Sequence, residues 1–180
     1  EKIMAVADQV DPFFGVFLAL VEALGWRVSA ICQLRADDVD RRKHPSAPHG
    51  RILKRGETDK EGVEQWVPLS QDARRALDRL PTIGGNLFAN VEGKAWTRWH
   101  ARDLLERAEK LAKLEALEGS DFHAYRRKWA TERKHLPDAD VMAAGGWRDP
   151  RSLKGSYQKV DPETLLAVVT EPRKLREAKG

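Results

Sequence analysis

The sequence is poor in the features that mark secreted, membrane and disulfide-bonded proteins. Cys32 is the one cysteine, so no disulfide can form within the chain, and a reducing compartment fits. The longest apolar run, Phe13 to Val21, is too short to span a bilayer. We therefore expect a soluble, cytoplasmic protein with no membrane partner.

Several common catalytic signatures are also missing. His44, His49, His100 and His135 do not form a metal-ligand spacing with Cys32. No glycine-rich phosphate loop ending in Lys-Ser or Lys-Thr occurs, and there is no Gly-x-Ser-x-Gly elbow. These absences argue against a zinc enzyme, a phosphate-loop nucleotide hydrolase and a serine hydrolase of that type, and we expect no metal and no cofactor.

The composition is that of a single folded domain. The chain has 180 residues, of which 41% are hydrophobic and 33% charged, enough apolar residues to bury a proper core. Its 32 basic and 28 acidic residues leave a formal net charge of +4. This mildly basic balance permits a nucleic-acid partner but does not identify one.

Hydrophobic periodicity predicts a mostly helical chain. Phe13, Phe17, Leu20 and Leu24 share one face of a helix over 12–24 that ends at Gly25. Further helices are predicted over 29–34, 70–80, 97–117 and 123–135, with more helix starts at 138, 149 and 161.

Local start signals support several of these helices. Ser29 and Ser70 each stand where an N-cap would lie, and Thr97 opens the long helix over 97–117. Asp161 followed by Pro162 is a strong start, because proline fits the first helical position.

Two strand-like segments interrupt the helices. Arg51–Lys54 and Val63–Leu69 flank the polar stretch 56–62, which suits the tip of a hairpin. Residues 40–50, with two prolines and Gly50, are predicted to form a loop. The predicted fold class is therefore mainly α with a small antiparallel β-sheet (α+β).

Five scattered residues have the chemistry needed to attack a phosphodiester: Arg27, Lys60, His123, Arg126 and Tyr157. His123 and Arg126 are three apart on a predicted helix, so they share one face. Arginine presents a planar fork of donors that matches phosphate oxygens, and histidine moves protons near neutral pH. A tyrosine hydroxyl, with a pKa of about 10, needs an electropositive pocket or a base to become nucleophilic. By themselves, His123 and Arg126 are weak evidence for a phosphate site, since surface His and Arg often fall at this spacing.

The surrounding segments resemble, in order, the boxes of the tyrosine recombinases, the phage integrase family. Leu24-Gly-Trp-Arg27-Val-Ser-Ala, continuing to the Asp-Val pair at 38–39, is similar to the first arginine box. His123-Ala-Tyr-Arg126, with Ala-Thr at 130–131, resembles the second arginine box. Ala144-Gly-Gly-Trp147 resembles the Leu-Gly-His box, and Tyr157 follows ten residues after the tryptophan, at the nucleophile position. Lys60 falls where that family's hairpin carries its catalytic lysine.

The resemblance assigns a role to each residue. Arg27 and Arg126 would bind the nonbridging phosphate oxygens and stabilise the charge of the transition state. Tyr157 would attack the phosphorus, with His123 helping to remove its proton, and Lys60 would protonate the departing 5′ oxygen. Trp147 would donate its indole N–H to a phosphate oxygen or pack against the pocket. The implied product is a 3′-phosphotyrosine link, formed without metal or ATP.

The chain departs from the family pattern at one position. Ala30 stands where the family often has Glu or Asp three residues after the first arginine. Asp37 and Asp38 are the candidate substitutes for that carboxylate. Tyr125, the other tyrosine, lies on the opposite side of the predicted helix from His123 and is expected to be structural.

The resemblance also implies an organisation. Residues 1–170 would form the tyrosine recombinase catalytic domain, 171–180 a polar C-terminal tail, and an upstream DNA-binding domain would precede this fragment. The expected partner is duplex DNA, with a homotetramer on DNA, a monomer without it, and association with the nucleoid. The helix after Asp161 would dock on a neighbouring copy, or else pack on its own domain, through Leu165, Leu166, Val168 and Val169.

Three alternative functions stay open at this point. A type IB topoisomerase would use the same chemistry to relax DNA, and a noncatalytic relative would bind DNA with the same fold. A general phosphodiesterase ranks lower, because the sequence offers no metal site.

Overall fold

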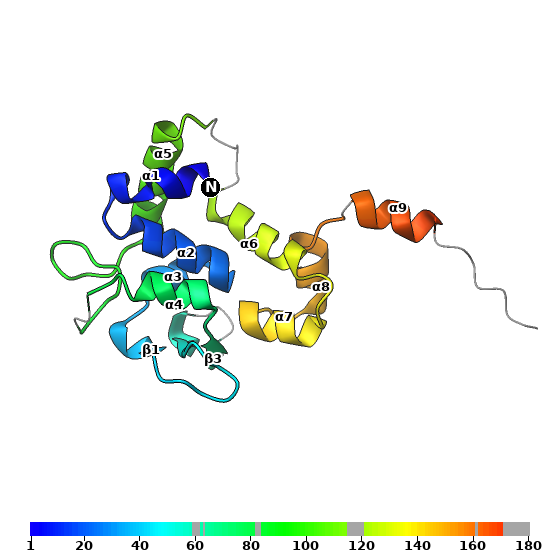
Figure 1. The fold of residues 1–180 in the computed structure, drawn as a ribbon, viewed down its shortest axis with the longest axis horizontal. Coiled ribbons are helices and arrows are strands. Elements are labelled where there is room, and N and C mark those ends of the chain that lie inside the picture. Colours follow the sequence, from blue (N-terminus) through cyan, green and yellow to red (C-terminus); the bar gives the residue numbers. More distant parts are fainter. Residues whose placement is uncertain (59–61, 63, 82–83, 115–120, 161, 171–180) are drawn as a thin grey trace, which may run out of the picture.

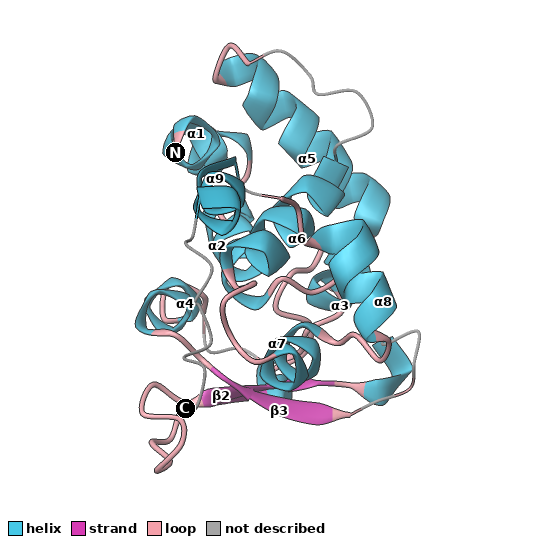
Figure 2. Ribbon diagram, turned by 90° about the vertical axis from the view of Figure 1, so that its right-hand side faces the viewer, coloured by secondary structure: helices cyan, strands magenta, loops and turns pink. Residues whose placement is uncertain are grey.

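The computed structural model describes residues 1–58, 62, 64–81, 84–114, 121–160 and 162–170. Helices make up most of the molecule, and the small sheet lies at one edge of it (Figures 1 and 2). The fold is thus mainly α with a small antiparallel sheet, as the sequence predicts. None of the described helices is both long and apolar enough to cross a membrane.

The first helices build the centre of the fold. α1 (Lys2–Val10) and α2 (Phe14–Leu24) contact each other, and α2 also contacts α4 (Gln71–Leu77) and α6 (Asp121–Glu132). α2 is buried along most of its length because nearly all of its residues are apolar. The sequence analysis did not predict α1, and α2 begins two residues later than expected.

Two predicted N-caps are confirmed and a third is wrong. Ser70 Oγ accepts a hydrogen bond from the amide of Ala73 at 3.2 Å, and Thr97 Oγ1 accepts one from His100 at 3.1 Å. The helix predicted to start at Ser29 is α3 (Val28–Cys32), and its N-cap is Arg27. Ser29 therefore lies inside the first turn and does not cap it.

The long helix is shorter than predicted. α5 runs from Arg98 to Leu111, and residues 115–117 of the predicted span lie outside the described residues. Leu104, Leu105 and Ala108 are buried as predicted, but Leu111 is exposed, because the helix extends beyond the body that covers its apolar face.

The sheet has three antiparallel strands in the order β1-β2-β3. These are β1 (Val39–Asp40), β2 (Arg51–Lys54) and β3 (Gln65–Pro68). The register pairs Val39 with Ile52 and Ile52 with Val67. The β2–β3 hairpin is confirmed, whereas β1 was not predicted.

The C-terminal elements follow as a series of short helices. α7 (Asp138–Gly145) leads to α8 (Pro150–Ser152), where Asp149 caps the start, and the chain continues as a π-helical turn over Leu153–Tyr157. α9 (Pro162–Thr170) projects away from the body (Figure 1). Its apolar side chains are exposed, so packing on its own domain is not observed: Leu165, Leu166, Val168 and Val169.

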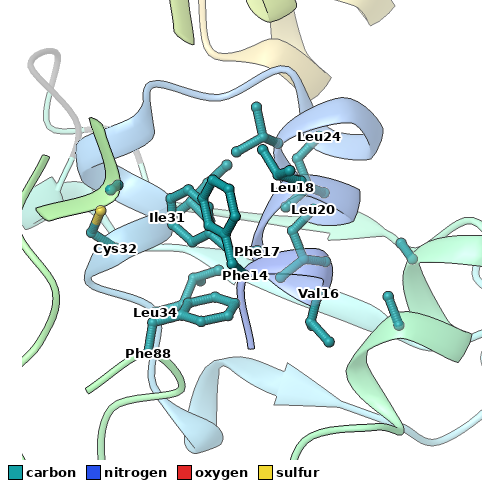
Figure 3. Packing of buried hydrophobic residues seen from close by; sticks show 14 of the residues in the cluster. Phe14, Val16, Phe17, Leu18, Leu20, Leu24, Ile31, Cys32, Leu34 and Phe88 are labelled. Atoms are coloured by element: carbon teal, nitrogen blue, oxygen red, sulfur yellow. The ribbon is translucent and has the colours of Figure 1, made fainter. Parts of the chain in front are cut away.

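The buried residues that the structure describes form two clusters. The main core takes residues from α1 through the start of α6, and its aromatic centre is Phe14, Phe17, Phe88, Trp96 and Phe122. Figure 3 shows Phe14, Phe17 and Phe88 packed among aliphatic side chains of this core. The second cluster is far smaller and consists of Trp129, Ala130, Val141, Trp147 and Leu153. α6 contributes to both clusters and so connects them.

Candidate functional site

Arg27 is positioned by the turn that ends α2. Gly25 closes that helix with a φ of +61°, a left-handed conformation that favours glycine. A Cβ at Gly25 would lie 2.4 Å from the Trp129 ring, so the close approach of α6 also requires glycine. Trp26 Nε1 then donates to the carbonyl of Ala144 at 2.8 Å. The turn is therefore tied to both α6 and the end of α7.

Arg126 is the most buried charged group among the predicted site residues that the structure describes. The residue is 2% exposed, and its guanidinium donates through Nη1 to the carbonyls of Gly25 and Gly145, the latter at 2.8 Å. Its Cζ lies 3.6 Å from the centroid of the Trp147 ring. A buried cation is costly unless it is hydrogen-bonded, and these contacts, all from Nη1 and the ring face, supply part of that compensation. Arg126 thereby joins three of the predicted boxes.

Arg27, His123 and Arg126 line one pocket of about 270 Å³. Its other walls come from Trp26, Val28, Ser29, Phe122 and the α5 side chains Arg98, Trp99 and Arg102. Of the two predicted arginines, Arg27 is the N-cap residue of α3 and Arg126 lies within α6. The pocket concentrates positive charge, which suits an anion such as a phosphodiester.

Trp147 and Tyr157 meet Arg126 from another side. The Trp147 ring stacks on Trp129 with centroids 5.9 Å apart, and Tyr157 approaches Trp147 edge-on at 5.1 Å. Arg126 Cζ is 5.2 Å from the centroid of the Tyr157 ring. Trp147 Nε1 is buried and has no hydrogen-bond partner within the described part of the chain. A buried N–H without a partner is uncommon in folded proteins.

The π-helical turn that ends at Tyr157 is held in place by contacts to α6. Thr131 Oγ1 donates to the carbonyl of Tyr157 at 3.1 Å and accepts from the amide of Lys159 at 3.2 Å. Leu153, at the start of the turn, is fully buried in the second cluster. One hydroxyl and one leucine thus attach the tyrosine segment to α6.

The turn after α7 is closely packed. Gly146 has a φ of +74°, and a Cβ there would lie 2.0 Å from Lys54 Nζ. A Cβ at Gly145 would lie 2.0 Å from the Trp147 ring. Lys54 is therefore a buried neighbour of the site that the sequence analysis missed, because nothing in β2 distinguishes it from an ordinary strand-end lysine.

The predicted site residues have different outcomes. The structure brings Arg27, His123 and Arg126 into one pocket and places Trp147 and Tyr157 against Arg126. Lys60 lies outside the described residues. Arg98, Trp99 and Arg102 also line the pocket, although they were not predicted. They approach it because α3 and α5 pack together, a contact without any local sequence signal.

Asp38 is a buried carboxylate that lies near Ala30. Both line a small cavity together with Lys54 and Arg55. Asp38 accepts from Arg55 Nε at 2.5 Å and from the amide of Arg35 at 2.8 Å. This hydrogen bond also raises the pKa of Arg55. Asp37, the other candidate, is exposed.

The two tyrosines occupy contrasting surroundings. Tyr125 packs against the main core beside Phe122, with ring centroids 6.0 Å apart. Burial raises the pKa of Tyr125 to about 12, so its hydroxyl is even less ready to ionise than a free tyrosine. Tyr157 instead lies against Arg126 and Trp147.

The basic residues of α6 and of the turn after it, Arg126, Arg127, Lys128 and Arg133, do not form a uniform surface strip. Arg126 is buried, and Arg133 lies over the Trp129 ring at 4.3 Å and donates to the Trp129 carbonyl at 3.0 Å. Burial lowers the pKa of Arg133. Neither arginine is a freely solvated side chain, whereas Lys128 is exposed.

Comparison with known proteins agrees with this arrangement. The sequence model of the phage integrase family matches residues 1–164. The tyrosine recombinase XerC of Corynebacterium efficiens is 28% identical over 173 residues, which cover 90% of this chain and 52% of that protein. The chain therefore spans about half the length of this curated relative.

Solved structures share the fold. The XerA recombinase superposes with a TM-score of 0.72 at 16% identity, covering 96% of this chain and 61% of that one. A lambda integrase tetramer bound to a Holliday junction gives a TM-score of 0.68 at 22% identity, covering 88% and 45%. The fold is that of tyrosine recombinase catalytic domains, and the chain belongs to the phage integrase family.

Proposed function

We propose that the chain is the catalytic part of a site-specific DNA recombinase or integrase that cleaves and rejoins DNA strands through a 3′-phosphotyrosine intermediate. The observation that carries the proposal is the position of Arg126. It lines the pocket with Arg27 and His123 while its guanidinium lies against Trp147 and the ring of Tyr157. One buried cation thus connects a phosphate-sized pocket to a candidate nucleophile.

The scissile phosphate binds in this proposal between Arg27 and Arg126. Two guanidiniums neutralise the nonbridging oxygens and stabilise the additional charge of the pentacoordinate transition state. Trp147 Nε1, a buried donor, supplies a further hydrogen bond to a phosphate oxygen. Because Arg126 is fixed by two carbonyls, little reorganisation is needed as the charge develops.

The chemical step exchanges one phosphoester for another. Tyr157 Oη bonds to phosphorus while the bond to the 5′ oxygen breaks, and His123 assists removal of the phenolic proton. Lys60 protonates the departing 5′ oxygen. Attack by a 5′ hydroxyl of a second strand on the 3′-phosphotyrosine reverses the step. Since the number of phosphoester bonds is unchanged, no ATP is consumed.

Duplex DNA is the proposed substrate, and a homotetramer on DNA the proposed assembly. The exposed apolar residues of α9 are unusual for a surface and suit docking on a neighbouring copy. The lambda integrase structure is a DNA-bound tetramer of the same fold. We further propose that residues 1–170 form the catalytic domain, that 171–180 are a tail, and that an upstream DNA-binding domain completes the protein.

A nicked suicide duplex carrying the attachment site tests the nucleophile. Wild-type protein is expected to form a covalent adduct, seen as a band shift on a denaturing gel, and Tyr157→Phe is expected to form none. Tyr125→Phe is the matched control and should retain the adduct, because that ring packs in the core. Adduct formation by Tyr157→Phe would overturn the assignment. Exchange between two marked duplexes would then distinguish a recombinase from a topoisomerase.

A substrate with a bridging 5′ sulfur tests Lys60. Sulfur leaves without needing a proton, so the cleavage defect of Lys60→Ala should largely disappear on that substrate. Lys54→Ala is the comparison, since Lys54 is the buried lysine beside Gly146. Rescue of Lys54→Ala in place of Lys60→Ala would transfer the acid role to Lys54.

A further inference from the structure

The pocket beside Arg27 is extended by the first turn of α5. Arg98, Trp99 and Arg102 line it together with Arg27 and Arg126. Arg98 Cζ lies 4.3 Å from the centroid of the Trp99 ring, and Trp99 is itself 57% exposed. Stacking on an aromatic ring limits the freedom of a guanidinium while leaving its edge donors available.

A second hollow of about 810 Å³ begins on the other side of the same side chains. Ser29, Arg98 and Trp99 line both hollows, so they form the wall between them. The second hollow also takes Arg35 and Lys94 into its lining, together with the carboxylate of Glu57. Two positively lined hollows therefore lie next to each other along the protein surface.

The pocket holds more positive charge than one phosphodiester requires. Four guanidiniums line it, whereas a single phosphodiester carries one negative charge. Arg126 is engaged by two carbonyls, and Arg102 pairs with Glu106 at 2.9 Å. Among the described residues, no carboxylate lies within ion-pair distance of Arg98. Arg98 is thus an exposed, oriented cation between two hollows, without an anionic partner in the part of the chain that the structure describes.

We propose that Arg98, held by Trp99, binds the phosphate next to the scissile phosphate on the same DNA strand, with that neighbour entering the second hollow. Each strand of duplex DNA carries one charge per about 3.4 Å of helix axis, so successive phosphates suit adjacent hollows. The inference rests on the proposed function for the meaning of "scissile", but the phosphate contact itself does not require cleavage.

The salt dependence of DNA binding tests the contact without any cleavage. The probe is a labelled 24-base-pair duplex of arbitrary sequence, titrated by fluorescence anisotropy over a series of NaCl concentrations. The plot of log K against log salt has a negative slope, and losing one phosphate contact decreases the magnitude of that slope by about 0.9. We expect this decrease for Arg98→Ala, and no decrease for Arg75→Ala, an exposed arginine of α4 that lines neither hollow.

Arg98→Lys separates charge from geometry. Lysine retains the charge, so the slope should stay near the wild-type value, while affinity decreases because the stacked fork is lost. An unchanged slope in Arg98→Ala, or no salt-dependent duplex binding by the wild type, would overturn the proposal. A changed slope without covalent adduct would instead refute cleavage and leave the contact standing.

Neutral methylphosphonates locate the contact once the adduct has identified the cleavage site. A single substitution at the adjacent phosphate should weaken wild-type binding and leave Arg98→Ala without further loss. If the methylphosphonate and Arg98→Ala instead lowered the affinity independently, so that their fold-losses multiplied, the assignment would be contradicted. Non-additivity appearing only several nucleotides away would do the same.

Discussion

The two buried clusters of this protein differ in size and in what they hold. The main core extends from α1 to the start of α6 and fixes Arg27 and His123, which adjoin its residues Trp26 and Phe122. The second cluster has five buried residues and carries Trp147 and, through Leu153, the segment ending at Tyr157. The pocket thus rests on the large cluster, while the candidate nucleophile rests on the small one.

This difference suggests a division of roles. A large core over-determines the position of its side chains, whereas a small one lets its segment open at low free-energy cost. Arg126 connects the two, because it donates to Gly25 on one side and Gly145 on the other. We infer that the phosphate pocket stays rigid and that the tyrosine segment is the part able to rearrange.

Phe17→Ala should have the largest effect on stability. Its ring is fully buried and meets Phe88, Trp96 and Phe122, so the cavity should cost about 4 kcal/mol of unfolding free energy. Urea unfolding followed by circular dichroism measures this loss. Leu111→Ala, at an exposed leucine, is the control and should change little. A loss under 1 kcal/mol for Phe17→Ala would contradict a single main core.

Arg126→Lys should both remove the contacts that join the two clusters and slow DNA cleavage. Lysine cannot reach both carbonyls and stack on Trp147, so we expect cleavage to slow about 10²–10³-fold. Single-turnover adduct formation measures the rate. Arg127→Lys, the neighbour on α6, should stay near the wild-type rate. Equal cleavage rates for the two variants would show that Arg126 contributes only its positive charge and not its guanidinium geometry.

Leu153→Ala should act locally. The side chain is fully buried in the second cluster, and its loss should cost about 3 kcal/mol. Hydrogen exchange should speed up in residues 153–157 while the amides of α2 keep their protection. Uniformly faster exchange across both clusters would show that the small cluster does not open by itself.

Thr131→Val should give the smallest change. The swap removes the hydroxyl that bonds the Tyr157 carbonyl and the Lys159 amide, at a cost of about 1 kcal/mol. Cleavage should slow several-fold because the tyrosine segment is less well positioned. Ser70→Ala is matched in stability, since losing that cap also costs about 1 kcal/mol, and it should leave cleavage unchanged. Equal slowing in both would attribute the effect to stability alone.

The sequence predicted much of the secondary structure where local signals are strong. The apolar face of α2, the caps at Ser70 and Thr97, and the strand Arg51–Lys54 all follow from periodicity and hydrogen-bonding chemistry within a few residues. α1 and β1 were missed. β1 has two residues and exists because β2 pairs with it, and α1 is stabilised by packing on α2 and α5.

The candidate site shows the same limit. The spacing of His123 and Arg126 indicates that they share one helix face. Both line the pocket, yet Arg126 is buried and His123 is exposed. That spacing singles out Arg126, but nothing local indicates that Arg126 is buried whereas Lys128 is exposed. Its burial depends on two carbonyls that lie far away in sequence.

By itself, the sequence determined the fold class, the family and the order of the residues proposed for catalysis, because these depend on residue types and short-range spacing. The tertiary structure alone decided that Arg126 joins the two clusters, and that Arg98 and Trp99 stand beside the pocket. The reason is physical: helix periods and caps act over a few residues, whereas burial and charge compensation depend on groups brought together only by folding.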